Sequence, residues 1–328
     1  MTTRRKILIV LGAGALAPSV ACAQPQKKWR IGFLGLRQID FSDADDYYGP
    51  FTQGLRDLGY VEGRNVSIEW RSAEGKAERL AGLAAELVRS EVNVLVTVAS
   101  SASLAAQRAT NSIPIVMVNV GDPIGLGLVK TLARPGGNST GLSNLTTELY
   151  AKRLAMLREM MPRILRIAFL LNPTSESSAP QLQNAQAAAR KLGLTVQPYY
   201  AATTQEIATA FSEMARHKAQ ALVVQLGPFF LQNNTLIAEL AVRYRIPSIG
   251  GHGGYTEAGG LMSYGNDNRE NPRRAAVFVD KIFKGAKPGD LPIEQPTKFE
   301  LVLNLKAARS LGLKVPNSIL AQATKVIE

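Results

Sequence analysis

An alternation of short apolar segments and longer amphipathic segments, repeated in both halves of the chain, constrains the fold more than any other feature. The short segments have the length of strands, and the longer ones have helical periodicity. Strands connected through helices pair in parallel, because each crossover packs on a face of the sheet. The sequence therefore predicts an α/β fold with two doubly wound parallel sheets. Strands are expected at residues 30–36, 65–70, 94–98 and 115–118, and at 166–171, 195–199, 221–225 and 247–250.

The same residue pairs stand at corresponding element ends in the two halves of the chain. Leu-Gly pairs at 58–59 and 192–193 end the first helix of each half, as is usual for a glycine that follows a helix. Ile-Pro pairs at 113–114 and 246–247 precede the fourth strand of each half. The helices are expected to end at 58, to span 76–90, to begin near 101, and to span 125–132, 148–160, 180–192, 204–216 and 233–244.

Each half is expected to form one lobe, with the loops at the carboxyl ends of its strands available for function. Residues 260–328 carry further expected strands at 261–264 and 299–303 and a helix at 272–283, so this part of the chain crosses back between the lobes. Several crossovers then form the hinge. We assign residues 29–143 with about 263–295 to the first lobe, 144–262 to the second, and 296–328 to a C-terminal strand and helices at the hinge or second lobe.

The first 23 residues have the pattern of a secretory signal peptide. Basic residues 4–6 precede an apolar run at 7–20, and Ala21-Cys22-Ala23 supplies a small-residue cleavage site. The apolar run is too short to span a bilayer comfortably. We expect cleavage after Ala23 and export. Lipid anchoring through Cys22 is a less favoured alternative, because Ser19 stands where a large aliphatic residue is usual.

Composition and motifs argue against an enzyme. One cysteine and two histidines cannot form a Cys/His zinc site of three or four protein ligands. Residues 137–141 spell G-x-S-x-G, but they follow a turn instead of a strand, and no Asp lies between Ser139 and His252. A phosphate-binding P-loop motif does not occur. We therefore expect no catalytic residues, no cofactor and no metal.

Long sequence blocks are similar to those of a known family. They read GDPIG at 121–125, LVKTLARPGGNSTG at 128–141, GLRDLGYVEG at 54–63, EAGGLMSYG at 257–265 and EQPTKFELVLNL at 294–305. These blocks resemble the ABC-transporter substrate-binding proteins, a family that includes tryptophan-binding members. The resemblance covers nearly all of residues 29–328.

The resemblance implies a type I periplasmic binding fold that holds a small molecule between its lobes. It further implies delivery of that molecule to an ABC permease in the inner membrane, with an amino acid or another small carboxylate as the favoured ligand. A periplasmic protein that senses a ligand for a signalling receptor is the alternative, which the sequence does not separate from transport.

Nucleic acid is a disfavoured partner. The chain has 38 Lys and Arg against 26 Asp and Glu, for a net charge of +12, which would suit a repressor of the same two-lobed fold. A repressor needs a helix-turn-helix before the first lobe, and only residues 24–29 separate the expected cleavage site from the first strand. We expect a monomer with its basic residues scattered over helix faces.

Candidate ligand contacts in the first lobe follow its strands. Ser100 and Ser101 lie where a helix N-terminus could bind a carboxylate, although Ser101 could also act only as a helix cap. Asp122 could accept hydrogen bonds from an ammonium group, or it could be a turn residue before Pro123. Arg37 begins the first loop and should border the cleft. This expectation extends from Arg37 through Asp40, whereas the acidic residues at 43, 45 and 46 are more typical of a solvated surface.

Candidate contacts in the second lobe include aromatic residues that could stack on a flat ligand or could pack in the core. His252, among glycines at 250–254, could donate to a carboxylate or sense pH, or could be an ordinary surface histidine. Tyr264 could face the cleft at the hinge or belong to the core. The full set in this lobe is Asn172, Gln225, Phe229, His252, Tyr255 and Tyr264.

Overall fold

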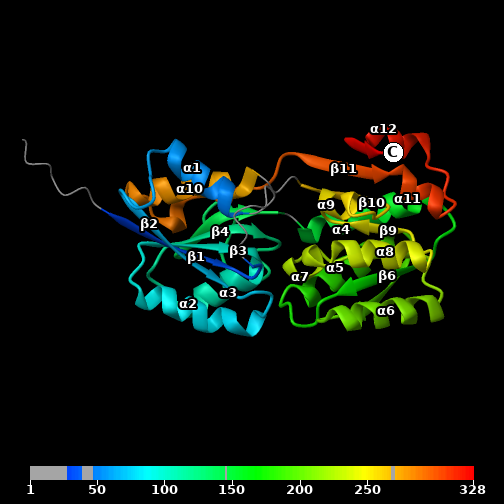
Figure 1. Ribbon diagram of the computed structural model, residues 1–328, viewed down its shortest axis with the longest axis horizontal. Coiled ribbons are helices and arrows are strands. Elements are labelled where there is room, and N and C mark those ends of the chain that lie inside the picture. Colours follow the sequence, from blue (N-terminus) through cyan, green and yellow to red (C-terminus); the bar gives the residue numbers. More distant parts are fainter. Residues whose placement is uncertain (1–27, 39–46, 145, 267–269) are drawn as a thin grey trace, which may run out of the picture.

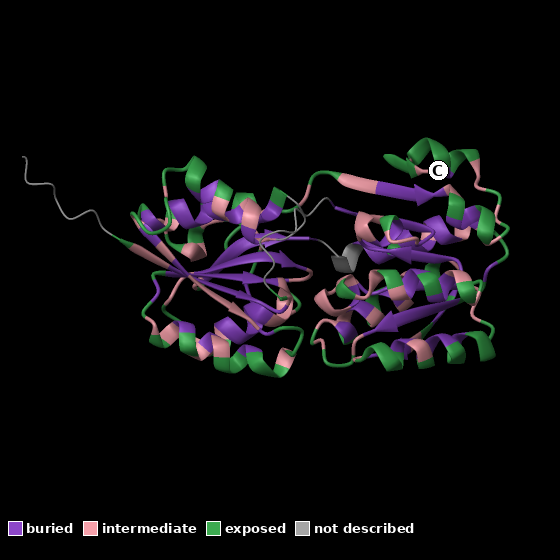
Figure 2. Ribbon diagram, viewed as in Figure 1, coloured by how far each residue is buried: buried purple, intermediate pink, exposed green. Residues whose placement is uncertain are grey.

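A computed structural model describes residues 28–38, 47–144, 146–266 and 270–328. Two lobes lie side by side, each with a central sheet between layers of helices (Figure 1). The central strands of both sheets are buried and the outer helix faces are exposed (Figure 2). The expected signal peptide and the acidic residues at 40–46 lie outside the described residues.

The first lobe has a five-stranded parallel sheet with the strand order β2-β1-β3-β4-β5. Helices α2 (Leu80–Arg89) and α3 (Ala99–Ala109) pack on one face of this sheet. Helices α1 (Tyr48–Asp57) and α10 (Glu270–Phe283) pack on the other face, although α10 comes much later in the chain. The strands are β1 (Trp29–Gly35), β2 (Val66–Ser72), β3 (Val94–Val98), β4 (Ile115–Val120) and β5 (Ser139–Ser143).

The second lobe has a seven-stranded sheet in the order β12-β11-β10-β9-β8-β6-β7, in which β10 and β11 pair antiparallel and the other neighbours pair in parallel. Its strands are β6 (Arg166–Leu171), β7 (Thr195–Tyr200), β8 (Ala221–Val224), β9 (Ser248–Gly250), β10 (Met262–Asn266), β11 (Phe299–Asn304) and β12 (Lys325–Ile327). One face is covered by α4 (Thr146–Met160), α5 (Ser178–Lys191), α11 (Leu305–Ser310) and α12 (Asn317–Gln322). The other is covered by α6 (Thr204–Arg216), α7 (Pro228–Gln232), α8 (Asn234–Arg243) and α9 (Gly253–Glu257).

The chain passes between the lobes three times: after β5, after β10 and before β11. Before the third passage, Glu294 lies beside β5, where its amide donates to the Gly141 carbonyl and its carbonyl accepts from the Ser143 amide. This arrangement forms the multi-crossover hinge that the sequence predicts.

The structure differs from the sequence-based expectation at β10 and at residues 125–132. Strand β10 belongs to the second sheet, so the return to the first lobe begins with α10 and not near residue 263. The helix expected at 125–132 is a series of turns, in which the Pro123 carbonyl accepts from the amides of Leu128 and Val129. Two glycines, at 125 and 127, weaken helix propensity there.

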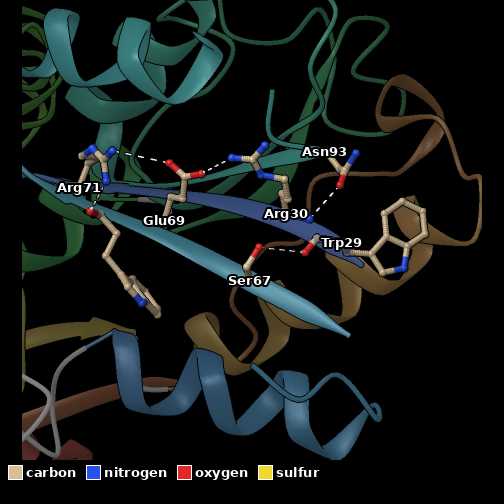
Figure 3. Close-up of polar contacts among 7 residues, drawn as sticks. Trp29, Arg30, Ser67, Glu69, Arg71 and Asn93 are labelled. Carbon is tan, nitrogen blue, oxygen red and sulfur yellow. Dashed lines mark hydrogen bonds and ion pairs between the residues drawn. The ribbon is translucent and has the colours of Figure 1, made fainter. Parts of the chain in front are cut away.

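Charged side chains line the outer edge of the first sheet (Figure 3). Arg30 on β1 donates to Glu69 on β2 at 2.6 Å, and Arg71 approaches the same carboxylate at 3.6 Å. The hydrogen bond from Arg30 holds the pKa of Glu69 below its ordinary value. Strand β2 is at the edge of the sheet, and charged side chains on an edge strand disfavour pairing with a strand of another chain.

Candidate functional site

The carboxyl ends of both sheets meet between the lobes, and two small cavities lie there, of about 60 and 40 Å³. Four residues border both: Ser101 from the first lobe and Ser175, Gly227 and Pro228 from the second. In a doubly wound sheet this is the edge at which ligands bind. The larger cavity is also bordered by Tyr47, Ala99, Ser100, Asn119, Gly121, Asn144, Ser177, Gln181, Leu226 and Leu231, and the smaller by Leu36, Gly75, Ala77, Asn172, Thr174, Gln225, Phe229 and Phe230.

The first helical turn of α3 forms part of the first-lobe wall. The helix begins at Ala99, earlier than expected, so Ser100 and Ser101 lie inside it, and no side chain caps its N-terminus. The Ser100 hydroxyl accepts weakly from the Gly121 amide, at 3.5 Å. Ser101 is therefore not a helix cap, and the amides of this turn remain directed toward the cavity end of the helix.

Asn119, at the end of β4, is a wall residue that the sequence did not single out. Its φ of 61° is uncommon for a residue other than glycine, and such conformations concentrate at functional sites. Its side-chain oxygen accepts from Asn271 of α10, and its carbonyl accepts from Asn144 at 3.2 Å. Asn144 lies where the first passage between the lobes begins, and Asn271 lies where the second passage ends. Asn119 therefore connects the cavity to the hinge.

A buried hydrogen-bond network forms the second-lobe wall. The Gln225 side chain, 2% exposed, accepts from the Asn172 amide at 2.7 Å and donates to Ser178 and to Gln181. Gln181 also accepts from the Tyr150 hydroxyl at 2.9 Å. Because every member has partners within the network, this wall is rigid and orients the polar groups that border the cavity.

Aromatic side chains close one end of the smaller cavity. Phe229 and Phe230 follow Pro228 at the start of α7, and their rings pack edge to face at 5.1 Å. Phe230 is buried, whereas Phe229 is partly exposed toward the cavity. Phe229 therefore has the position expected for an aromatic ligand contact.

Five predicted contacts do not border either cavity, and one of these, Asp122, borders a different hollow. Within the described residues, Arg37, His252, Tyr255 and Tyr264 border neither cavity. Tyr255 belongs to the core: it is 2% exposed and donates to Ser248 at 2.6 Å. His252 caps α9, where its Nδ1 accepts from the Gly254 amide, and Tyr264 stacks on Phe299 at the edge of the core.

Asp122 borders a separate interlobe hollow of about 480 Å³ that also contacts Lys191 and Gln295. Its carboxylate accepts from the Gly125 amide at 2.8 Å. That bond stabilises the turn, as the turn interpretation of this residue predicts. Asp122 therefore lies beside the cleft, with its carboxylate engaged locally.

Arg153 on α4 is fully buried, and the sequence analysis missed it. It lies on the apolar face of the helix, three residues after Tyr150 and one before Leu154. Its Nε donates to the Tyr264 carbonyl at 2.8 Å, and its guanidinium lies 5.0 Å from the centre of the Tyr150 ring. Burial lowers the pKa of this guanidinium, which nevertheless stays charged in proteins. A charged residue at a core position of a periodic helix was the signal available in the sequence.

In the part of the chain that the structure describes, no cluster of three His, Cys, Asp or Glu side chains could hold a metal ion. No helix among those residues has the length and apolarity needed to cross a membrane.

Comparison with known proteins gives consistent matches. A family model for ABC transporter substrate binding proteins matches residues 38–327. A tyrosine-binding protein from Clostridioides difficile (strain R20291) is 25% identical over 330 residues, which cover 96% of this chain and 94% of that protein.

Two crystal structures share the fold over their whole length. A conserved domain protein from Vibrio cholerae has a TM-score of 0.85 and 27% identity, and an ABC domain from Streptococcus pneumonia in complex with L-Trp has 0.82 and 28%. Each match covers 92% of this chain and 100% of the other.

Proposed function

The chain belongs to the ABC transporter substrate-binding protein family, and from this premise we propose that it binds an aromatic amino acid between its lobes. The family consists of solute-binding proteins and not of enzymes. The resemblance and the type I periplasmic binding fold predicted from the sequence are both confirmed.

The observation that carries the proposal is the pair of cavities between the lobes, which combine polar groups with an aromatic wall. Ser101 and the first turn of α3 offer hydrogen-bond donors from one side. Phe229 offers a ring face from the other, and aromatic stacking favours a flat side chain. A relative named as tyrosine-binding and a similar structure in complex with L-Trp support an aromatic amino acid over a sugar.

We further propose that the protein works outside the cytoplasm and passes its ligand to an ABC permease for import. Residues 1–23 have the pattern of an export signal, and a ligand held between two lobes can be released when they separate. Binding on both lobes stabilises the closed form by differential affinity, which lets a permease distinguish loaded from empty protein.

The experiment is a thermal-unfolding panel with L-tyrosine, L-tryptophan, L-phenylalanine, L-leucine and glucose, followed by calorimetric titration of each compound that shifts the transition. Ligand at a hundredfold its Kd stabilises by about 2.7 kcal/mol, which raises Tm by several degrees. A shift with leucine or glucose alone would contradict the aromatic assignment. If no compound shifts Tm, native mass spectrometry of the purified protein identifies any ligand that it already carries.

A further inference from the structure

Arg153 is a buried cation that the described protein does not neutralise. Its side chain has no exposed surface, and neither terminal guanidinium nitrogen has a hydrogen-bond partner among the described residues. Only Nε is used, in the bond to the Tyr264 carbonyl. The Tyr264 carbonyl and the Tyr150 ring are neutral partners, and a buried charge without an opposite charge is unfavourable, so this site favours a counter-charge.

The guanidinium lies directly behind the cleft wall. A Cβ atom placed on Gly251 would come within 2.9 Å of Arg153 Nη2 and 3.0 Å of Leu226 Cβ. Leu226 itself borders the interlobe cavity of about 60 Å³. Gly251 follows β9 and Leu226 follows β8, so the guanidinium is at the carboxyl edge of the second sheet. It occupies space that is open because residue 251 has no side chain.

The first lobe presents an unused donor to the cavity that Leu226 borders. Asn119 is 6% exposed, and its Nδ2 has no hydrogen-bond partner within the described residues, although its Oδ1 and carbonyl both accept bonds. The side-chain oxygen is committed to Asn271, so the amide nitrogen is the group left for a ligand. The unpaired groups of Arg153 and Asn119 are thus all N–H donors.

We propose that Arg153 binds the carboxylate of the ligand from the second lobe, and that Asn119 donates a hydrogen bond to the same anionic group from the first. This inference rests on the proposed function and names the ligand class more narrowly, as a free carboxylate. Two parallel N–H donors of a guanidinium match the two oxygens of a carboxylate. The first turn of α3, with Ser100 and Ser101, then faces the rest of the ligand instead of its carboxylate.

Closure follows from the same geometry. Each lobe alone leaves donors unpaired, and an anion between them satisfies both sets only when the lobes are together. The ligand therefore contributes differential stability to the closed form, as population shift requires. Because Asn119 contacts Asn144 and Asn271, the anion is linked directly to two of the chain segments that join the lobes.

The test compares Arg153→Met and Arg153→Lys with wild type, using L-tyrosine and its decarboxylated analogue tyramine as probes in calorimetry. The matched control is Lys152→Met, since Lys152 is the exposed neighbour on the same helix. Wild type and K152M should bind L-tyrosine at least about 100-fold more tightly than tyramine, and R153M should lose about 100-fold in L-tyrosine affinity. R153K should fall between them, because lysine keeps the charge without the paired donors.

The melting temperature without ligand separates this role from a structural one. Removal of an unpaired buried charge should leave Tm of R153M equal to or higher than that of wild type. A lower Tm, or unchanged L-tyrosine affinity in R153M, overturns the inference. If wild type binds neither L-tyrosine nor L-tryptophan, the aromatic proposal fails. The comparison of Tm between ligand-free R153M and wild type still tests whether the charge of Arg153 is unpaired in the protein.

Discussion

Arg108 of α3 and Glu176, in the turn before α5, form an ion pair of 2.5 Å that joins the first lobe to the second. Ser175 and Ser177, which flank Glu176 in the sequence, border the interlobe cavity of about 60 Å³, so the ion pair lies at the rim of that cavity. It can form only while the lobes are close together. The pair is therefore a contact of the closed conformation, placed at the edge of the proposed binding site.

Breaking this pair should weaken ligand binding slightly without harm to either lobe. Arg108 is 70% exposed and Glu176 39%, and exposed pairs contribute about 0.2–1 kcal/mol. Arg108→Ala should thus raise the Kd for L-tyrosine by up to about fivefold in low salt. The difference should shrink at 1 M salt because of screening. Arg216→Ala, which removes an exposed pair within α6, is the control and should leave Kd unchanged. A salt-independent effect of R108A would rule out the ion pair as its cause.

Ser101 borders both cavities, so a larger side chain there should fill space that the ligand needs. Ser101→Leu should raise the Kd by about tenfold or more, with a urea midpoint close to that of wild type, because the serine is partly exposed. Ser318→Leu makes the same change in the first turn of α12, far from the cavities, and should bind normally. Normal affinity in S101L would remove this turn of α3 from the site.

Two glycines of the block at 128–141 should respond differently to alanine. Gly141 has a φ of +132°, and a Cβ there would lie 2.1 Å from the Met117 carbonyl oxygen on β4. Gly141→Ala should cost about 3 kcal/mol or more, since neither backbone can move without disturbing the pairing of β4 with β5. Gly137 has no atom within 4 Å of its Cβ position, so Gly137→Ala should stay within about 0.5 kcal/mol. Urea unfolding distinguishes the two, and equal midpoints would contradict the packing argument.

The sequence predicted the parts of the fold that depend on local periodicity. Strands such as Val94–Val98 and Arg166–Leu171 are almost entirely apolar because both faces of their sheets are covered. Strand β5 was missed because four of its five residues, Ser139 to Ser143, are small, and only pairing with β4 makes them a strand. Strand β10 was correctly predicted to be a strand, but sequence alone did not show in which sheet it would pair.

Residues that border the cavities were predictable only where they lie in the segment that follows a strand. Ser101, Asn172, Gln225 and Phe229 were identified in this way and all border the cleft. Tyr255 also follows a strand, but space left by two glycines takes its ring into the core. Arg153 lies on a helix face, so its link to the cleft depends on packing of α4 against Gly251, which no local pattern reveals.

Tyr60, in the turn after α1, makes stability depend on alkaline pH. Its hydroxyl donates to Asp280 of α10 at 2.9 Å, and burial together with this bond raises its pKa to about 12. The folded pKa lies above the ordinary value of 10.0, so the contribution is complete below pH 10 and is lost as pH rises toward 12. Tyr60→Phe should lose about 1 kcal/mol at pH 8, and the gap to wild type should close between pH 10 and 12 in urea titrations. Tyr200→Phe, at a tyrosine 51% exposed on β7, is the control and should track wild type throughout. A gap that stays constant across this range would show that packing, and not the ionisable hydroxyl, carries the contribution of Tyr60.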